Sequence, residues 1–487
     1  MPETPERIDL GPGLSISRLV CGLWQVADLE KDGTTLDLER GADALDAYAR
    51  AGFDSFDMAD HYGSAELIAG RLLARHGTGP GRPLAFTKWC PEPGPMTAAV
   101  VRRGVQDRLD RLGVDRVDLL QFHWWTFEHP AWLDALHEMA RLQAEGLIGA
   151  IGVTNFDAAH LAVALADGVP VLTNQVSFSL IDRRASGALS DLCRSRGVKL
   201  LAYGTLCGGF LLDKWLGRPE PASMPDWSRS KYKRFIDAAG GWGVFQGILQ
   251  AAADVAGKHG VSLSNVATRW VLEHEAVAAA IIGARLGESE HRADNLKVFG
   301  FALDAEDRGR LDDAFAEATP IPGDCGDEYR RPPYLTASGD LSHHLDAIPS
   351  IFMAEPVPGR PDRLRVSSGS VWDPIAGYSR AVRVKDTIRV SGTTATHGGD
   401  RCVAPGDPGA QATYILDKIA ASIAALGGSM EDVVRTRIYL RDAKKWEPVS
   451  RAHGRVFGAV KPANTLVQAG DLVGDYEVEI EAEAVVS

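Results

Sequence analysis

The sequence has no cysteine pair of the C-x-x-C type, although its 487 residues include six cysteines. The cysteines are scattered along the chain, which is typical neither of a metal site nor of a disulfide scaffold. We therefore predict no metal, and reduced thiols in a cytoplasmic protein are the simplest interpretation. No apolar run is long enough to span a membrane, and the polar start MPETPERIDLGPG predicts no signal peptide.

Positive charge is also in short supply, because 65 acidic residues outnumber 52 lysines and arginines and give a net charge of −13. Nonspecific nucleic-acid binding requires a basic surface, so we predict no nucleic-acid partner. An anionic cofactor is still compatible with an acidic chain, because a few local cations and helix N-termini can hold its phosphates.

From about residue 17 to residue 300, short apolar runs alternate with longer amphipathic stretches. The stretches 38–52, 97–113 and 131–146 have helical periodicity and end in glycine. This alternation predicts a parallel sheet covered by helices, and eight repeats predict a closed (β/α)8 TIM barrel. An open sheet would require a G-x-G-x-x-G turn after the first strand, where this chain has ADLEKDGTTLD. The predicted strands are 17–26, 55–60, 83–89, 117–124, 149–156, 171–178, 199–206 and 278–284.

Two later regions break this pattern. Residues 207–242 include a stretch rich in Pro, Gly and Ser, and we predict a long loop that forms a lid or pocket wall at the barrel mouth. Beyond residue 316 the repeat dissolves, and two helical and several strand-like segments then predict a small α+β domain. We therefore predict a barrel over 1–345, a linker over 346–363 and the α+β domain over 364–487.

Four polar residues stand at the ends of consecutive predicted barrel strands. Asp57 and Tyr62 lie at and just after the second strand, Lys88 ends the third, and His123 ends the fourth. Barrel geometry places all four at one mouth. Each has a structural explanation alone, as a helix cap, packing residue, surface charge or core histidine. Together they indicate a catalytic site.

These residue types suit proton donation to a substrate. Tyrosine has an ordinary pKa of about 10, and we expect the Lys88 ammonium to lower the pKa of Tyr62 toward neutrality. Asp57 would hold Lys88 in place and keep it protonated, and His123 would orient a carbonyl oxygen. Hydride transfer would be the chemistry of a bound cofactor, which the protein positions.

Residues 8–345 resemble the aldo-keto reductase family. The elements D-x-A-x-x-Y-G, T-K, the strand-four His, I-G-V-[ST]-N-F and N-Q occur in family order and at family spacing. The resemblance implies that Asp57, Tyr62, Lys88 and His123 form a catalytic tetrad with Tyr62 as the acid. It also implies a reductase of aldehydes or ketones that uses NAD(P)H, or the reverse oxidation of an alcohol.

The same resemblance implies contacts to the nicotinamide end of the cofactor. Thr154, Asn155 and Gln175 would bind the nicotinamide amide, and Tyr203 would stack on the ring. Leu206 follows in the segment AYGTL, which resembles the family's A-Y-S-P-L and completes these contacts. Gly204 replaces the family's serine there, which removes one hydrogen bond to the cofactor.

The segment IIGARLGESEHRADNL resembles the family's phosphate and adenosine site. Gly283 and Arg285 would face the phosphates, and His291 and Asn295 the adenosine. Arg285 favours NADPH, because a planar cation suits a 2′-phosphate. NADH stays open as an alternative, because the family often has Arg or Gln at the position of His291.

Tryptophans near strand ends predict an aromatic substrate pocket, since small-ligand sites usually have apolar walls and few polar groups. The alternative, for Trp24 and Trp125 in particular, is packing in the core. The predicted pocket residues are Trp24, Trp89, Trp124 and Trp125.

Residues 365–487 resemble the Rid family of reactive intermediate deaminases, through YSRAV, VSGTTA, DVVRTRIYLRD and PANTLVQAGDLVGDYEVEIEA. The resemblance implies a chorismate-mutase-like α+β fold that trimerises, with clefts between subunits. Tyr378 and Glu479 match the family's pocket tyrosine and water-activating glutamate. Asn464 stands where deaminating members have an arginine that binds a carboxylate, and an amide cannot form that ionic clamp. We therefore expect action on another imine or enamine, ligand sensing, or trimerisation alone.

The sequence leaves three functions open. The first is a carbonyl reductase with a tethered partner domain, and the second is a sugar or alcohol dehydrogenase. The third is an NADPH-binding sensor or scaffold that the Rid-like domain trimerises. The complete tetrad favours an enzyme, because a scaffold has no need of it. The expected partners are a small carbonyl or alcohol substrate and further copies of the chain.

Overall fold

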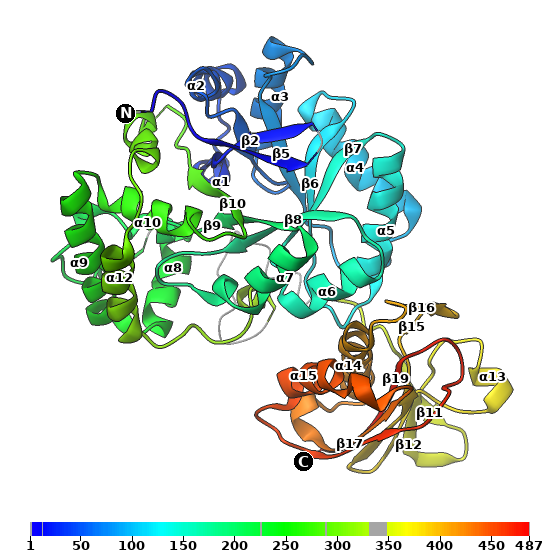
Figure 1. Cartoon of the computed structure of the whole chain (residues 1–487). Helices are drawn as coiled ribbons and strands as arrows, with labels where there is room; N and C mark the ends of the chain where they lie inside the picture. Colours follow the sequence, from blue (N-terminus) through cyan, green and yellow to red (C-terminus); the bar gives the residue numbers. More distant parts are fainter. Residues whose placement is uncertain (1, 12, 225, 288–289, 331–347, 487) are drawn as a thin grey trace.

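Eight parallel strands close into a barrel in the computed structural model, which describes residues 2–11, 13–224, 226–287, 290–330 and 348–486 (Figure 1). The predicted TIM barrel is confirmed, and each predicted strand run overlaps one barrel strand. Neighbours follow the order β10-β3-β4-β5-β6-β7-β8-β9. The strands are β3 (Leu19–Gly22), β4 (Ser55–Asp57), β5 (Leu84–Trp89), β6 (Val117–His123), β7 (Ile148–Thr154), β8 (Val171–Ser177), β9 (Lys199–Tyr203) and β10 (Val277–Gly283).

Helices cover the outside of the barrel, which is why a strand such as β6 is buried along its whole length. Local signals set the helix ends: Asp37 caps α2, Thr97 caps α4, and Gly113 ends α4 in a left-handed conformation. The helices of this region are α1 (Trp24–Glu30), α2 (Leu38–Arg50), α3 (Ala65–His76), α4 (Ala98–Leu112), α5 (Ala131–Ala144), α6 (Ala158–Ala166), α7 (Ala188–Arg196), α8 (Trp227–Ala238), α9 (Gly241–His259), α10 (Leu263–Leu272), α11 (Arg292–Asn295) and α12 (Ala305–Ala316).

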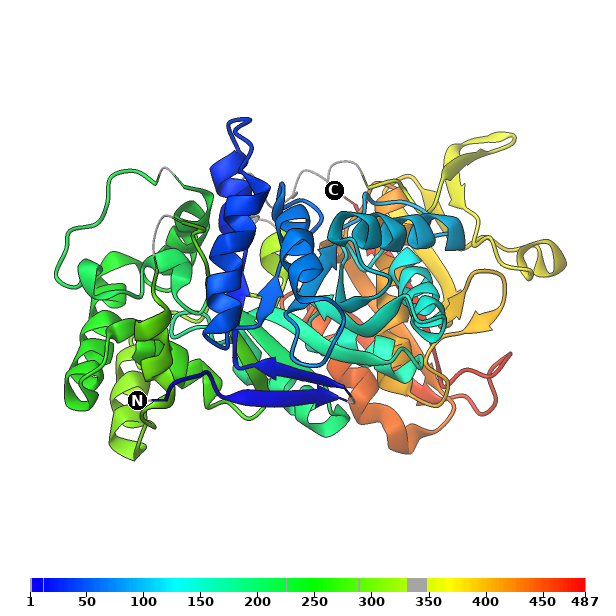
Figure 2. The ribbon, with the colours of Figure 1, turned by 90° about the horizontal axis from the view of Figure 1, so that it is seen from above.

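A hairpin that the sequence did not predict precedes the barrel. Strands β1 (Arg7–Gly11) and β2 (Leu14–Ser17) pair antiparallel and appear in dark blue in Figure 2. Leu10, Leu14 and Ile16 pack on residues from several barrel strands in a separate apolar cluster. The hairpin therefore closes the N-terminal end of the barrel and leaves the other end as the mouth.

The prediction of a loop over 207–242 is wrong for its second half. Helix α8 begins after Asp226, whose side chain accepts a hydrogen bond from the Arg229 backbone N–H. Tyr232, Phe235 and Ile236 form its buried stripe at helical spacing. The proline- and glycine-rich part of the segment lies before this helix and obscured its signal.

A seven-stranded sheet with the order β11-β12-β13-β14-β19-β17-β18 forms the C-terminal domain. Neighbouring strands are antiparallel except β17 and β18, and α14 packs on the sheet. Part of the predicted linker 346–363 belongs to this sheet, because β11 and the start of β12 extend its edge; residues 346–347 lie outside the described part. The elements are β11 (Ala354–Val357), β12 (Arg360–Val366), α13 (Asp373–Ala376), β13 (Ala381–Val384), β14 (Thr387–Thr393), β15 (Thr396–His397), β16 (Arg401–Cys402), α14 (Pro408–Ala425), β17 (Val433–Leu440), α15 (Trp446–Phe457), β18 (Ala463–Gln468) and β19 (Val478–Val485).

The C-terminal domain docks on the barrel through α14, which lies against α6 (Figure 1). His160 Nε2 of α6 is 3.0 Å from Asp417 Oδ2 of α14, and Arg401 Nη1 is 2.8 Å from Asp167 Oδ2. Burial opposes protonation of His160, but the carboxylates of Asp157 and Asp417 outweigh it and raise the pKa of His160. The junction is therefore held by charge pairs. Among the described helices, none has the length and hydropathy needed to cross a bilayer.

Candidate active site

An ion pair lies at the mouth of the barrel. Lys88 Nζ donates a hydrogen bond to Asp57 Oδ2 at 2.6 Å, and each residue is only 3% exposed. The pair joins β4 and β5, and Lys88 Nζ also lies 5.0 Å from the centroid of the Tyr62 ring. Three of the four predicted catalytic residues are therefore in direct proximity.

Two glutamines hold the carboxylate of this pair from the other side. Gln121 Nε2 and Gln175 Nε2 donate to Asp57 Oδ1 at 3.0 and 2.7 Å, and Gln175 Nε2 also lies 2.9 Å from Gln121 Oε1. The sequence analysis missed Gln121, although it precedes His123 by two residues and so shares its face of β6. We assigned Gln175 only to the cofactor, whereas it also positions Asp57.

The predicted effect of Lys88 on Tyr62 is wrong. Burial, followed by the charge of Asp57, raises the pKa of Tyr62 well above its ordinary value. The main physical reason is burial, which disfavours the charged tyrosinate, and the Asp57 carboxylate adds to this effect by offsetting the ammonium charge of Lys88. Tyr62 is consequently a protonated phenol over the physiological pH range, which is the form that can donate a proton.

His123 is buried at the end of β6 as a neutral imidazole. Burial, followed by the charge of Arg330, holds the pKa of His123 well below its usual range. Its Nε2 has no hydrogen-bond partner within the described parts of the chain. A buried polar atom without a partner is costly, so this nitrogen is suited to bind a ligand oxygen. Tyr329 also lies at this site, because its ring centroid is 5.4 Å from that of His123.

The structure divides the four predicted pocket tryptophans into two pairs. Trp24 packs edge-on against Tyr62 at 5.0 Å, and Trp125 against His123 at 4.5 Å, so both lie beside the tetrad. Trp89 instead packs against Gly104 of α4, and the Trp124 ring stacks on Phe122. The assignment of these two to the pocket is corrected: they belong to the layer between the strands and the helices.

Residues predicted to bind the nicotinamide come together at the ends of β7, β8 and β9. Thr154 pairs in register with Gln175, and its Oγ1 is buried without a partner in the described residues. Tyr203 donates a hydrogen bond to Asn155 Oδ1 at 2.8 Å, and Asn155 has a left-handed backbone with φ 60°. An unsatisfied hydroxyl beside an amide and an aromatic ring fits the nicotinamide amide and ring.

The replacement of the expected serine by Gly204 has a structural reason. Gly204 has φ 67°, and a Cβ there would overlap the Tyr232 hydroxyl of α8. Tyr232 therefore occupies the space that a side chain at position 204 would take. Leu206, two residues further, is half-buried before the turn Cys207–Gly209.

The predicted phosphate and adenosine residues lie along an exposed stretch after β10. Gly283 is the last residue of β10, and Arg285 lies two residues further along the chain. His291 precedes helix α11 and Asn295 ends it, while residues 288–289 lie outside the described part. Burial, followed by the charges of Arg229 and Arg285, lowers the pKa of Lys214. This gathering of cations suits the phosphates of a dinucleotide, and the sequence analysis missed Lys214.

A segment after the barrel also reaches the mouth. Arg330 donates hydrogen bonds to the carbonyl oxygens of Asn155 at 2.6 Å and Trp124 at 2.9 Å. Glu328 is buried in an ion pair with Arg184, whose Nη1 lies 2.9 Å from Glu328 Oε2. No periodic pattern marks this segment in the sequence, so its contribution to the pocket was not predicted.

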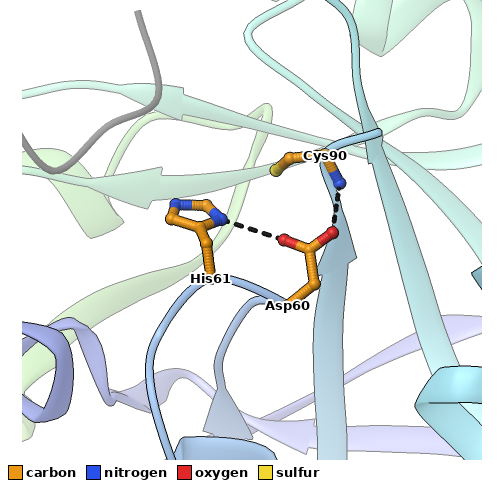
Figure 3. Close-up of side chains that lie close together, drawn as sticks. All are labelled: Asp60, His61 and Cys90. Carbon is orange, nitrogen blue, oxygen red and sulfur yellow. Dashed lines mark hydrogen bonds and ion pairs between the residues drawn. The ribbon is translucent and has the colours of Figure 1, made fainter. Parts of the chain in front are cut away.

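Asp60, His61 and Cys90 lie close together (Figure 3). The ring of His61 is 4.8 Å from that of Tyr62. Asp60 Oδ1 is 2.9 Å from His61 Nδ1, and Asp60 Oδ2 accepts a hydrogen bond from the Cys90 backbone N–H at 2.8 Å. Burial, followed by the charge of Asp60, raises the pKa of the Cys90 thiol well above its ordinary value. Through the two hydrogen bonds of Asp60, the cluster ties the loop that carries Tyr62 to the end of β5.

In the C-terminal domain, the three predicted cleft residues do not meet within one chain. Tyr378 and Glu479 line the same cavity of about 990 Å³. Asn464 on β18 is not among the residues that line it, and its Nδ2 lies 3.2 Å from His453 Nε2.

Similarity to known proteins agrees with this geometry. Residues 18–316 match the aldo/keto reductase family, and residues 369–486 match the endoribonuclease L-PSP family, to which the Rid proteins belong. Flagellar radial spoke protein 5 of Chlamydomonas reinhardtii is 33% identical over 177 residues, 32% of this chain and only 33% of that protein. Chloroplastic pyridoxal reductase of Arabidopsis thaliana is 25% identical over 332 residues, 64% of this chain and 87% of that protein.

Among solved structures, a glycerol dehydrogenase from Gluconobacter oxydans superimposes with a TM-score of 0.54 at 25% identity. The superposition covers 66% of this chain and 98% of that one. The chain thus belongs to the aldo/keto reductase family and carries a C-terminal domain of the endoribonuclease L-PSP (Rid) family.

Proposed function

We propose that the barrel is an NADPH-dependent reductase of aldehydes or ketones with Tyr62 as the general acid. The observation that carries this proposal is the unpartnered Nε2 of His123 at the mouth that also holds the Lys88–Asp57 pair and Tyr62. A neutral imidazole and a protonated phenol are both hydrogen-bond donors, as a carbonyl oxygen requires.

Each residue has a separate part in the reaction. NADPH, when bound, supplies the hydride that converts the carbonyl carbon to an alcohol carbon. Tyr62 donates its proton to the carbonyl oxygen, and His123, in its Nε2–H form, donates a hydrogen bond to that oxygen. Lys88, at 5.0 Å from the Tyr62 ring, stabilises the tyrosinate that remains.

Thr154, Asn155, Gln175 and Tyr203 would hold the nicotinamide end, and Gly283, Arg285, His291 and Asn295 the phosphate and adenosine end. The planar Arg285 beside Lys214 favours the additional phosphate of NADPH over NADH. The names of the relatives, a pyridoxal reductase and a glycerol dehydrogenase, suggest aromatic aldehydes and polyols as first substrates to try in the two directions.

The decisive experiment follows the nicotinamide absorbance with the full-length chain and a panel of aldehydes, ketones and sugars. Tyr62→Phe should lower kcat by about 10²- to 10⁴-fold, the usual contribution of a general acid. NADPH affinity, measured by fluorescence titration, should not change. Tyr48→Phe, a buried tyrosine of α2, is the matched control and should keep full activity.

Full activity of Tyr62→Phe would disprove the proposed mechanism. Tight NADPH binding without turnover in either direction would favour the alternative, a cofactor-binding sensor. We further propose that the Rid-like domain assembles copies of the chain, which sedimentation analysis would test.

A further inference from the structure

A large cavity lies outside the barrel mouth, in the C-terminal domain. It has a volume of about 990 Å³, which is ample for a small metabolite. Most of its wall comes from the C-terminal domain, but Glu128 and Pro130 of the β6–α5 connection complete it from the barrel. The cavity in this form therefore requires both domains.

Lys418 on α14 lines this cavity without a carboxylate partner. Its Nζ donates hydrogen bonds to the backbone carbonyl oxygens of Thr396 at 2.7 Å and Thr394 at 3.2 Å. It forms no ion pair with any described residue. Two carbonyl groups use two N–H bonds, so a neutral amine held here keeps its lone pair available for reaction.

Arg380 is a second cation in the same wall. It is 4% exposed, and its Nη1 donates to Gly392 O at 3.0 Å and Thr393 Oγ1 at 2.8 Å. Its buried Nε has no hydrogen-bond partner in the described chain, and it forms no ion pair there. A buried guanidinium with an unused donor next to a cavity is suited to an anionic ligand.

Burial, followed by the charge of Arg380, lowers the pKa of Lys418 to about 7. At neutral pH, Lys418 is thus the neutral, nucleophilic amine in about half of the molecules, against roughly one in a few thousand for an ordinary lysine. Glu479 lines the same cavity, and burial followed by the charge of Glu481 raises its pKa, so it holds a proton more readily than an exposed carboxylate.

We propose that this cavity binds a small aldehyde or ketone with an anionic group and that Lys418 forms an imine with it. The amine lone pair attacks the carbonyl carbon, and a proton moves from nitrogen to the former carbonyl oxygen to give a carbinolamine. The C–O bond then breaks as Glu479 supplies a proton, water leaves, and nitrogen returns its remaining proton to Glu479. The sum is amine plus carbonyl to imine plus water. Arg380 binds the anionic group.

The test is reductive trapping in the full-length chain. Glyoxylate, a small anionic aldehyde, is added with sodium cyanoborohydride at neutral pH, and carboxymethylated lysines are quantified by peptide mapping. Lys418 should react roughly a thousandfold faster than the exposed Lys444, from the neutral fraction of Lys418 compared with that of an ordinary lysine. Propanal, which has no anionic group, should label Lys418 at least several-fold more slowly.

Two outcomes would overturn the proposal. If Lys418 is labelled no faster than Lys444, Lys418 does not form the proposed imine. If propanal and glyoxylate label Lys418 equally fast, the cavity does not select an anionic ligand. Lys418→Met should lose the fast-reacting site, while Lys444→Met, the matched control, should keep it. The wild-type peptide map decides the question even if Lys418→Met does not fold. The proposal does not depend on turnover in the barrel.

Discussion

Two lysines of this chain, the buried Lys88 and the half-buried Lys418, have opposite surroundings. Lys88 at the barrel mouth has a carboxylate at 2.6 Å, which two glutamines hold in place. Lys418 in the C-terminal cavity has only backbone carbonyl oxygens. An ammonium removed from water needs a compensating negative charge to stay protonated. Lys88 has that charge and is suited to act electrostatically, whereas Lys418 lacks it and is suited to act as a nucleophile.

The largest effect is expected from the substitution of Lys88, the lysine that has a carboxylate partner. Lys88→Met leaves the Asp57 carboxylate buried without its counter-charge, which should lower the free energy of unfolding by about 3–5 kcal/mol. Chemical denaturation of the full-length chain measures this. The double variant Lys88→Met/Asp57→Asn should recover part of the loss, because it removes the unpaired charge as well. No recovery would show that packing, and not charge, determines the cost.

Removal of the unpaired lysine should have a smaller effect. Lys418→Met leaves the carbonyl groups of Thr394 and Thr396 without their donor. Both residues line the cavity, where water can replace the donor, so we expect a total cost of about 1–3 kcal/mol. The same denaturation experiment should place Lys418→Met below Lys88→Met in cost and above the exposed control Lys444→Met. If both substitutions lower the free energy of unfolding equally, then the difference in charge pairing between Lys88 and Lys418 does not determine the cost.

The pH dependence of trapping sharpens the comparison further. Below a pKa of about 7 the neutral fraction of Lys418 falls, so its rate of carboxymethylation should drop about tenfold per pH unit. Above that value the rate should level off. The other charged residues that line the cavity are Arg380, Glu128, Glu355 and Glu479. Arg380 is the one whose charge lowers the pKa of Lys418, so Arg380→Gln should move the midpoint upward. A rate that still rises steeply above pH 9 would indicate an ordinary exposed lysine.

Much of the barrel could be predicted because its signals are local. Apolar strands and glycine-ended helices repeat along the chain, and strand ends mark the mouth, so the positions of Asp57, Lys88 and His123 follow from the alternation. The same alternation places Trp89 on the face opposite Lys88, since the two are consecutive in β5. Its assignment to the pocket could therefore have been rejected from the sequence alone.

Other features depend on contacts between distant segments. The raised pKa of Tyr62 results from burial and from Asp57, and no motif reports the balance between Asp57 and Lys88. The approach of Glu328 and Arg330 to the mouth rests on Arg184 and Asn155, which are more than a hundred residues away. Strand β11 forms in predicted linker sequence because the edge of a sheet accepts it.

The β6–α5 connection begins directly after His123 and ends at Pro130, which lines the cavity of the neighbouring domain. The few residues of this connection thus lie between the proposed carbonyl site of the barrel and the proposed ligand site of the C-terminal domain. During evolution, a substitution there is selected for its effect on both sites, so the two halves of this fusion are not free to diverge independently. Replacement of the barrel by that of a relative would therefore also change the residues at positions 128 and 130 that line the second cavity.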